Sequence, residues 1–212
     1  MPKITSVELQ KKNKHRFNIY LDGEFAFGAD EDLVVNRRLV VGKIISPEDL
    51  NKILFEAEVG KLMERMYRLW SIRQRSEREV REYFRNKKKD ISQLVIDTLI
   101  ENLKKKGMIN DLEFAKSWVE ARRKSKQKGI RVIKQELYQK GIDKEVIEEA
   151  LSVKREGESE ENIARQALEK KMRVWKNLDP QKFRQKATEF LLRRGFEYEI
   201  VKEVIEKFGQ KG

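Results

Sequence analysis

The sequence contains no cysteine, and it has a single histidine and three prolines among its 212 residues. Without cysteine there is no disulfide framework, no thiolate metal site and no thiol nucleophile. The lone His15 stands between Lys14 and Arg16, and a zinc site needs several convergent ligands. His15 is therefore expected to be a surface residue of a turn, and neither a metal nor a cofactor is predicted.

Long apolar runs are also lacking. No uncharged stretch has the length needed to cross a membrane, and the first residues include no apolar run of signal-peptide length. The sequence thus predicts a protein that makes no membrane contact and stays in the cytoplasm.

Residue patterns typical of catalysis are missing as well. Gly42-Lys43 is followed by Ile44, without the upstream glycine or the hydroxyl residue of a phosphate-binding loop. The neighbouring carboxylates Glu148-Glu149 and Glu160-Glu161 would point about 100° apart on a helix, so they do not form a general acid/base pair. We expect that the protein is not an enzyme.

Charge, by contrast, is abundant and unevenly distributed. Charged residues make up 40% of the chain, and the net charge is +12. Residues 1–59 carry 9 basic against 10 acidic side chains, whereas residues 60–212 carry 39 against 26. Clustered cations attract phosphate and gain affinity by releasing counterions, so this asymmetry indicates a polyanionic partner.

The N-terminal 45 residues show the alternation of a small β-rich module. Apolar residues alternate with polar ones over residues 17–21 and again from Phe25 to Phe27, on either side of Asp22-Gly23. An Asp-Gly pair between alternating segments is typical of a type I′ hairpin. The apolar residues of segments 4–9 and 39–45 could add one or two further strands, and the acidic residues 30–32 are expected in exposed turns.

Helical spacing begins after Ser46-Pro47, a pair that fits an N-cap and the first helical position. The apolar stripe starts at Leu50 and Ile53. Gly60 is expected to kink or break this helix.

An internal repeat is the most specific feature of the rest of the chain. Three sets of apolar residues share the same offsets, apart from two extra residues in the first connection: Val80, Phe84, Ile91, Val95, Ile96, Leu99; Ile133, Leu137, Ile142, Val146, Ile147, Ala150; and Ala187, Leu191, Phe196, Ile200, Val201, Val204. Each set is preceded by another amphipathic stretch. The sequence therefore predicts tandem three-helix repeats in an elongated, curved array. The expected divisions are a β module at 1–45, a connecting helix at 46–59, and repeats at 60–108, 109–156 and 157–212.

Local signals support these divisions. Ser76 and Asn110 stand three residues before a glutamate, as in a capping box, and Asp179 precedes a proline. Gly141 and Gly195 stand where a helix end favours a left-handed residue, and Asn86 could serve in the first repeat. Gly107 and Gly157 fall near the ends of repeats.

Basic side chains gather in two groups, and we take them as candidates for contact with nucleic acid or a partner. The alternative is that individual cations pair with nearby carboxylates such as Glu77, Glu79 and Glu82. Arg78, Arg81 and Arg85 share one helix face. The candidates are Arg73, Arg75, Arg78, Arg81, Arg85, Lys87, Lys88 and Lys89 in the first group, and Arg122, Arg123, Lys124, Lys126, Lys128 and Arg131 in the second.

Tryptophans could stack on bases, as in proteins that bind single strands. Trp70 and Trp118 lie on apolar stripes, which favours packing in the core. For Trp175, next to basic residues and ahead of an expected loop, both roles stay open.

The chain resembles the RecX family over nearly its whole length. The N-terminal hairpin around residues 20–24 is similar to that of the longer, Gram-positive type, and Arg75-Ser76 with Glu79-Val80 and residues 107–111 resemble the first repeat and its junction. Residues that resemble the second repeat are Phe114-Ala115, Trp118-Val119, Arg122, Gly129, Ile133, Glu136-Leu137, residues 140–143 and Ala150-Leu151.

This resemblance implies tandem three-helix repeats and a monomer that lodges in the groove of a RecA filament on single-stranded DNA. It also implies inhibition of RecA ATPase, strand exchange and co-protease activity in recombination and SOS repair. Double-stranded DNA is left open as a further ligand. The alternative is a protein that acts on DNA directly, without a specific contact to RecA.

Overall fold

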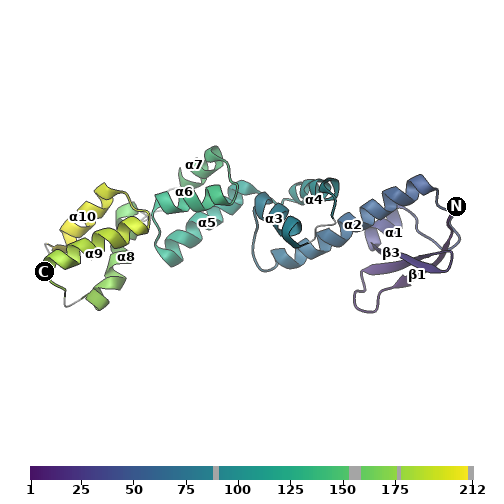
Figure 1. The fold of residues 1–212 in the computed structure, drawn as a ribbon, viewed down its shortest axis with the longest axis horizontal. Coiled ribbons are helices and arrows are strands. Elements are labelled where there is room, and N and C mark those ends of the chain that lie inside the picture. The colour runs from purple at the N-terminus through teal and green to yellow at the C-terminus, as the bar shows by residue number, and fades with distance from the viewer. Residues whose placement is uncertain (88–90, 153–158, 176–177, 210–212) are drawn as a thin grey trace. The chain divides into compact units, whose positions relative to one another are not determined.

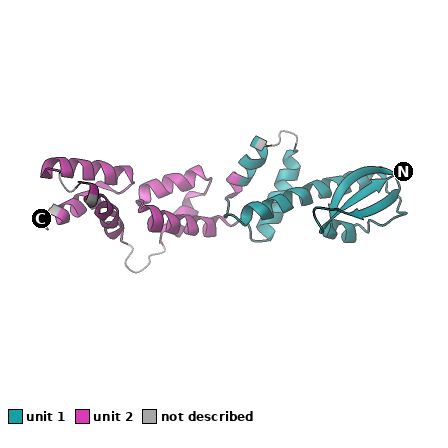
Figure 2. Cartoon of the chain, turned by 90° about the horizontal axis from the view of Figure 1, so that it is seen from below, with its two compact units in different colours: residues 1–75, 80–109 teal, residues 76–79, 110–212 magenta. Residues whose placement is uncertain are grey.

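The structure, a computed structural model, describes residues 1–87, 91–152, 159–175 and 178–209. The chain divides into two compact units (Figure 2): unit 1 comprises residues 1–75 and 80–109, and unit 2 comprises residues 76–79 and 110–212. It is mainly helical with a small N-terminal sheet (Figure 1), which confirms the predicted fold class.

The N-terminal module is an antiparallel sheet of β1 (Ile4–Leu9), β2 (Arg16–Leu21) and β3 (Glu24–Asp30) in the order β1-β2-β3. Between β2 and β3, Asp22 and Gly23 both have positive φ, 50° and 92°. Positive φ at both central residues defines the type I′ turn, so the predicted hairpin is confirmed.

The segment after the hairpin differs from the prediction. Glu31 and Asp32 are exposed as expected, but residues 31–36 form a short helix, α1 (Glu31–Asn36), instead of a turn. The Oδ1 of Asp30 caps this helix by accepting a hydrogen bond from the backbone N–H of Leu33 at 2.9 Å. The apolar residues of 39–45 form no strand; Ile44 makes only an isolated bridge to Lys3. Two turns of helix are too short to produce a readable period.

A single long helix, α2 (Pro47–Trp70), connects the module to the first repeat. It begins as predicted, since the Oγ of Ser46 accepts from the backbone N–H of Asp49 at 3.1 Å and Pro47 occupies the first turn. The expected break at Gly60 is absent. A Cβ at Gly60 would lie 2.4 Å from Oδ2 of Asp30, so this glycine admits the close approach of a carboxylate.

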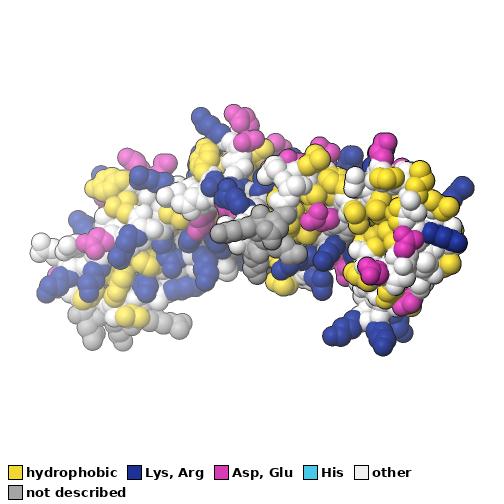
Figure 3. Space-filling model, turned by 45° about the vertical axis from the view of Figure 1, so that its right-hand side comes forward, with side chains coloured by type: hydrophobic (Ala, Val, Ile, Leu, Met, Phe, Trp, Pro, Cys, Tyr) yellow, Lys and Arg dark blue, Asp and Glu magenta, His cyan; other side chains and the backbone are white. Residues whose placement is uncertain are grey.

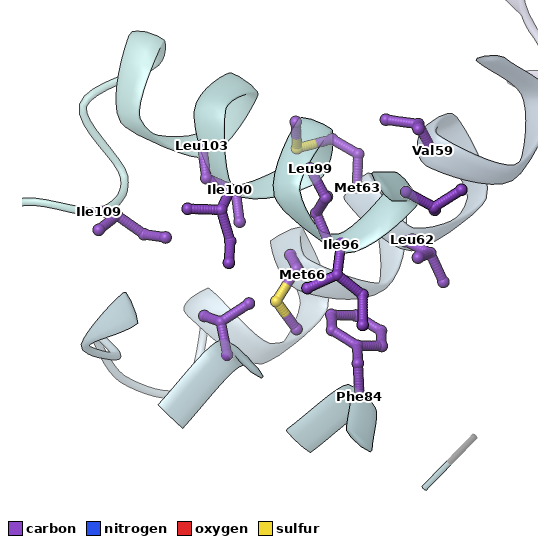
Figure 4. Packing of buried hydrophobic residues seen from close by; sticks show 12 residues of the cluster. Val59, Leu62, Met63, Met66, Phe84, Ile96, Leu99, Ile100, Leu103 and Ile109 are labelled. Carbon is purple, nitrogen blue, oxygen red and sulfur yellow. The ribbon is translucent and has the colours of Figure 1, made fainter. Parts of the chain in front are cut away.

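The remainder of unit 1 packs on the C-terminal half of α2. There α3 (Glu77–Lys87) and α4 (Gln93–Lys105) enclose a core that includes Met66, Phe84 and Leu99 (Figure 4). Ile53 and Ala57, earlier on α2, belong instead to the core of the N-terminal module. The same helix therefore serves two cores.

Unit 2 contains two further three-helix repeats. The first consists of α5 (Asp111–Lys126), α6 (Ile130–Gln139) and α7 (Lys144–Ser152), and the second of α8 (Glu160–Trp175), α9 (Pro180–Arg193) and α10 (Tyr198–Gly209). Each repeat has its own apolar core. The residues that the sequence aligns are buried in equivalent positions: Ile133 with Ala187, Leu137 with Leu191, Ile142 with Phe196 and Ile147 with Val201.

The predicted helix ends are also present. Side chains of Asn110 and Asp179 accept from backbone N–H groups three residues on, at 3.0 and 2.9 Å. Gly141 and Gly195 have φ of +78° and +88°. In the first repeat, α3 continues through Asn86 to Lys87, so Asn86 does not end the helix; residues 88–90 of the connection, like Gly157, lie outside the described residues.

One junction recurs within unit 2. The turn at Gly195 packs on the start of α6, where the backbone N–H of Gly129 donates to the carbonyl of Arg194 at 2.9 Å. A Cβ at Gly195 would lie 2.5 Å from the backbone nitrogen of Val132. At the equivalent place, the Oγ of Ser76 donates to the carbonyl of Lys140 at 2.7 Å. Because glycine has no side chain, Gly195 lets the start of α6 lie against its turn, and Gly141 does the same for the start of α3.

Candidate nucleic-acid interface

The first predicted basic group does not form one cluster within a unit. Arg73, Arg75, Arg81 and Arg85 belong to unit 1, whereas Arg78 belongs to unit 2. Arg73 and Arg85 are exposed, and Arg75 is half-buried. The side chain of Lys87 and all of Lys88 and Lys89 lie outside the described residues.

Arg81 forms an ion pair with Asp97 on α4. Hydrogen bonds from Arg81 and Gln93 hold the pKa of Asp97 below its usual value. Arg81 therefore links α3 to α4 within unit 1.

Half of the second group, three of its six cations, is engaged inside unit 2. Arg122 on α5 donates from Nε to Glu136 at 2.6 Å, and Lys128 donates to the other oxygen of the same carboxylate. Arg123 is buried and lies 3.4 Å from Oε1 of Glu160. These three cations link helices rather than face solvent.

The Glu136 carboxylate is the centre of a polar cluster between α5 and α6. It also accepts from Nε1 of Trp118 at 2.8 Å, and the guanidinium of Arg122 lies 4.0 Å from the centroid of the Trp118 ring. Burial acts to raise the pKa of Glu136, but hydrogen bonds from Lys128, Arg122 and Trp118 outweigh it and leave the pKa lowered. Trp118 stacks on Phe114, so it is part of the packing, as expected.

The Glu160 carboxylate behaves in the opposite way. Burial raises its pKa, although it accepts from the backbone N–H of Ile130 at 3.2 Å and lies beside Arg123. It joins the start of α8 to the start of α6, and thus the second repeat to the third.

Trp70 and Trp175 also belong to cores. Trp70 packs against the core of unit 1. Trp175 makes edge contacts with Phe183 and Phe190, with ring centroids 6.3 and 5.7 Å apart. The question left open for Trp175 is thereby answered in favour of packing.

A shallow cationic hollow, open to solvent, lies over one face of α6. Its volume is about 540 Å³, and its lining residues, which we call the basic groove, are Arg78, Arg131, Lys134, Gln135, Tyr138 and Gln139. Tyr138 is 44% exposed and Arg131 is exposed. Arg78 reaches the groove from the start of α3, where its aliphatic stem packs over Gly141. Lys134 also pairs with Glu148 at 2.6 Å.

Two of the six lining residues, Arg78 and Arg131, were among the predicted candidates. Lys134 and Tyr138 were not. The repeat alignment holds the missed signal, because Arg131, Lys134 and Tyr138 occupy the positions of Arg78, Arg81 and Arg85 in the first repeat. In the third repeat the same positions are Gln185, Thr188 and Leu192, which carry no charge.

The groove brings together basic side chains and an exposed aromatic ring. Arginine and lysine side chains contact phosphates, and an exposed aromatic ring can stack on an unpaired base. The exposed Lys124 and Lys126, near the C-terminal end of α5, add further cations to unit 2. On the face shown in Figure 3, basic side chains lie close together over the C-terminal repeats.

The described residues contain neither a candidate metal site nor a candidate membrane-spanning helix. These residues contain no cluster of three or more histidine or acidic side chains placed to hold a metal ion. Among the same residues, no helix is both long and apolar enough to cross a bilayer.

Fold and groove define the class: a mainly helical repeat protein with a cationic surface suited to binding. Family models match three parts of the chain, the regulatory protein RecX N-terminal domain over residues 2–46, the second three-helix domain of RecX over 110–151 and the third over 158–205. The chain belongs to the RecX family of regulatory proteins.

Individual relatives also support membership in the RecX family. The regulatory protein RecX of Bacillus subtilis is 38% identical over 204 residues, which cover 95% of this chain and 75% of the relative. That of Bacillus velezensis is 36% identical over 207 residues, with 98% and 78% covered. Both relatives are named as regulatory proteins.

Two solved structures have a similar fold. A crystal structure of regulatory protein RecX matches with a TM-score of 0.75 and 27% identity, covering 97% of this chain and all of the other. The structure of RecX from Lactobacillus salivarius matches with a TM-score of 0.61 and 26% identity, covering 72% of this chain and 97% of the other.

Proposed function

We propose that the protein binds the RecA filament on single-stranded DNA and inhibits RecA ATPase, strand exchange and co-protease activity. Membership in the RecX family supports this target, since the resemblance implies it. The observation that carries the DNA contact is the basic groove, which is lined by three cations and an exposed tyrosine.

Within this proposal, the groove contacts the nucleic acid. Arg78, Arg131 and Lys134 neutralise phosphates, and Tyr138 offers its ring to a base. Arg122, Arg123 and Lys128 stabilise the repeats instead, because each is bound to a carboxylate that is only 19% exposed, whereas the Glu148 carboxylate that pairs with Lys134 is 48% exposed. Lys124, Lys126 and the exposed arginines of unit 1 add longer-range attraction.

The direct test is co-sedimentation with RecA filaments formed on single-stranded DNA. The variant Arg131→Glu/Lys134→Glu should bind at least about tenfold more weakly, because two phosphate contacts become repulsive. The matched control is Lys186→Glu/Lys202→Glu, which makes the same charge change at exposed positions of the third repeat. It should bind within about twofold of the wild type, since neither residue lines the groove and both are exposed to screening by salt. Equal losses in both variants would remove the groove from the proposal.

A cationic groove is also compatible with the alternative, in which the protein acts on DNA without a specific contact to RecA. The dependence of binding on salt distinguishes this alternative from binding to the RecA filament. Pure phosphate contact weakens steeply as salt rises, whereas a grip on RecA itself persists. Binding to the filament that disappears with salt as fast as binding to naked oligonucleotide would favour the alternative.

A further inference from the structure

Unit 1 carries a second groove, of opposite electrostatic character. It has a volume of about 610 Å³ and runs across α2, between the N-terminal module and α4. The loop before β2, the start of α1, the middle of α2 and one face of α4 all contribute to its walls. We call it the acidic groove.

The floor of the acidic groove is apolar. Leu33, Val59 and Met63 line it with 6–8% of their surface exposed, and Phe55 is half-buried beside them. Tyr67, 43% exposed, lies at one end. Gly60 also lines the groove, and any larger residue there would meet the carboxylate of Asp30. A bound apolar side chain would therefore find an apolar surface within this groove.

The rim is acidic. Five carboxylates line the groove, against the cations of Arg16 and Lys106. Two carboxylates are already neutralised: Glu64 lies 3.2 Å from Arg16, and Glu56 pairs with Arg37. The other three, Asp30, Glu31 and Asp32, are consecutive at the start of α1.

Within this consecutive acidic run, Glu31 lies 3.7 Å from the exposed imidazole of His15, and the Oδ1 of Asp30 caps α1. Figure 3 shows hydrophobic side chains exposed among acidic ones over the N-terminal part of unit 1. Such a surface repels phosphate and attracts cations.

We propose that the acidic groove is a docking surface for a short protein segment that presents a lysine or arginine next to an apolar side chain. The cation pairs with the carboxylates of residues 30–32, and the apolar side chain packs against Val59 and Met63. Cavities of this volume are of the size that binds small ligands, so one or two side chains fit. This contact goes beyond the proposed filament binding and does not depend on RecA being the target.

The probe is a fluorescent nonapeptide of alternating lysine and leucine, titrated against the full chain by anisotropy. The variant Glu31→Lys/Asp32→Lys should lower its affinity at least about tenfold, because the rim charge reverses. The matched control Glu8→Lys/Glu24→Lys makes the same change at exposed positions of the sheet and should stay within about twofold. A peptide with serine in place of leucine should bind about tenfold more weakly, since it leaves the floor unfilled.

Lysines in the first turn of α1 oppose the helix dipole, so a second variant guards against misfolding. Asn102→Trp fills the groove from α4 without changing charge, and it should also abolish peptide binding while the circular dichroism is retained. The proposal is overturned by undetectable binding to the wild type, by equal losses in the rim variant and its control, or by equal binding of the serine peptide. A wild-type dimer in sedimentation that the rim variant abolishes would assign the groove to a second copy of the chain and also overturn it.

Discussion

Tyr138 is the residue through which the basic groove would favour single strands. Tyr138 is 44% exposed and lines the groove together with Arg131 and Lys134, and stacking contributes about 1–3 kcal/mol per base. Tyr138→Ala should lower affinity for a single-stranded oligonucleotide about tenfold and change duplex binding little, because paired bases are not free to stack.

The control is Tyr198→Ala, at a 60% exposed tyrosine on α10 outside the groove. Fluorescence anisotropy with both DNA forms measures the effect. Equal losses for single strands and duplex would indicate that Tyr138 only shapes the groove.

Glu136 gives a pH-dependent prediction. In the folded chain the pKa of Glu136 is lower than its ordinary value of 4.5. The ionised carboxylate therefore stabilises the fold fully above pH 4.5, and this stabilisation is lost as the pH falls from 4.5 through the lowered pKa. At pH 7, Glu136→Gln should destabilise unit 2 by about 2 kcal/mol, because Arg122 and Lys128 lose a charged partner. The difference from wild type should shrink below about pH 4.

Hydrogen exchange of the amides in α5 and α6 reports this local stability. The matched control, Glu148→Gln, removes a 48% exposed carboxylate that binds Lys134, and should cost less than about 0.5 kcal/mol. A difference between Glu136→Gln and wild type that stays constant down to about pH 3 would contradict the account of the cluster.

Among individual cations, sequence reasoning identified candidates but not their partners. The partner carboxylates are remote in sequence: Asp97 is 16 residues from Arg81, Glu136 is 14 from Arg122 and Glu160 is 37 from Arg123. Nearby glutamates were the only partners that a local pattern could suggest. The separation of structural cations from exposed ones required the packing of the helices.

Short elements show where sequence patterns suffice. The hairpin at Asp22-Gly23 and the helix starts at Ser46 and Asn110 were predicted because each depends on residues within a few positions. The prediction of a strand within residues 39–45 was wrong because the apolar residues of this segment do not share one environment. Leu39 and Ile45 are buried in the module core, whereas Val40, Val41 and Ile44 are at least 60% exposed.

The junction between the second and third repeats depends on a glycine with positive φ. Gly195→Ala should destabilise unit 2 by about 3 kcal/mol or more, because its Cβ would lie 2.5–2.7 Å from Val132 and the left-handed backbone adds strain. Hydrogen exchange in α6 and α9 should show the loss.

Gly42→Ala is the control that separates strain from collision. Gly42 has a similar φ, +92°, and a Cβ added there would meet no atom within 4 Å. Its substitution should cost only about 1–2 kcal/mol. Similar losses in the two variants would mean that the contact at Val132 contributes nothing.

For the whole molecule, the uneven charge seen in the sequence corresponds to two kinds of surface. Residues 1–59 contribute most of the acidic groove, and the excess of cations supplies the basic groove. Composition predicted a polyanionic partner, but it could not predict the acidic groove, whose walls come from segments as far apart in the sequence as Asn13 and Lys106. The curvature expected of the repeat array stays a prediction.

The central claim is that the chain restrains RecA on single-stranded DNA. The most direct measurement is RecA ATPase on a single-stranded template as the chain is added. We predict inhibition at amounts well below those of RecA, with Arg131→Glu/Lys134→Glu requiring about tenfold more protein and Lys186→Glu/Lys202→Glu acting like the wild type. Unchanged ATPase activity at saturating protein would contradict the claim.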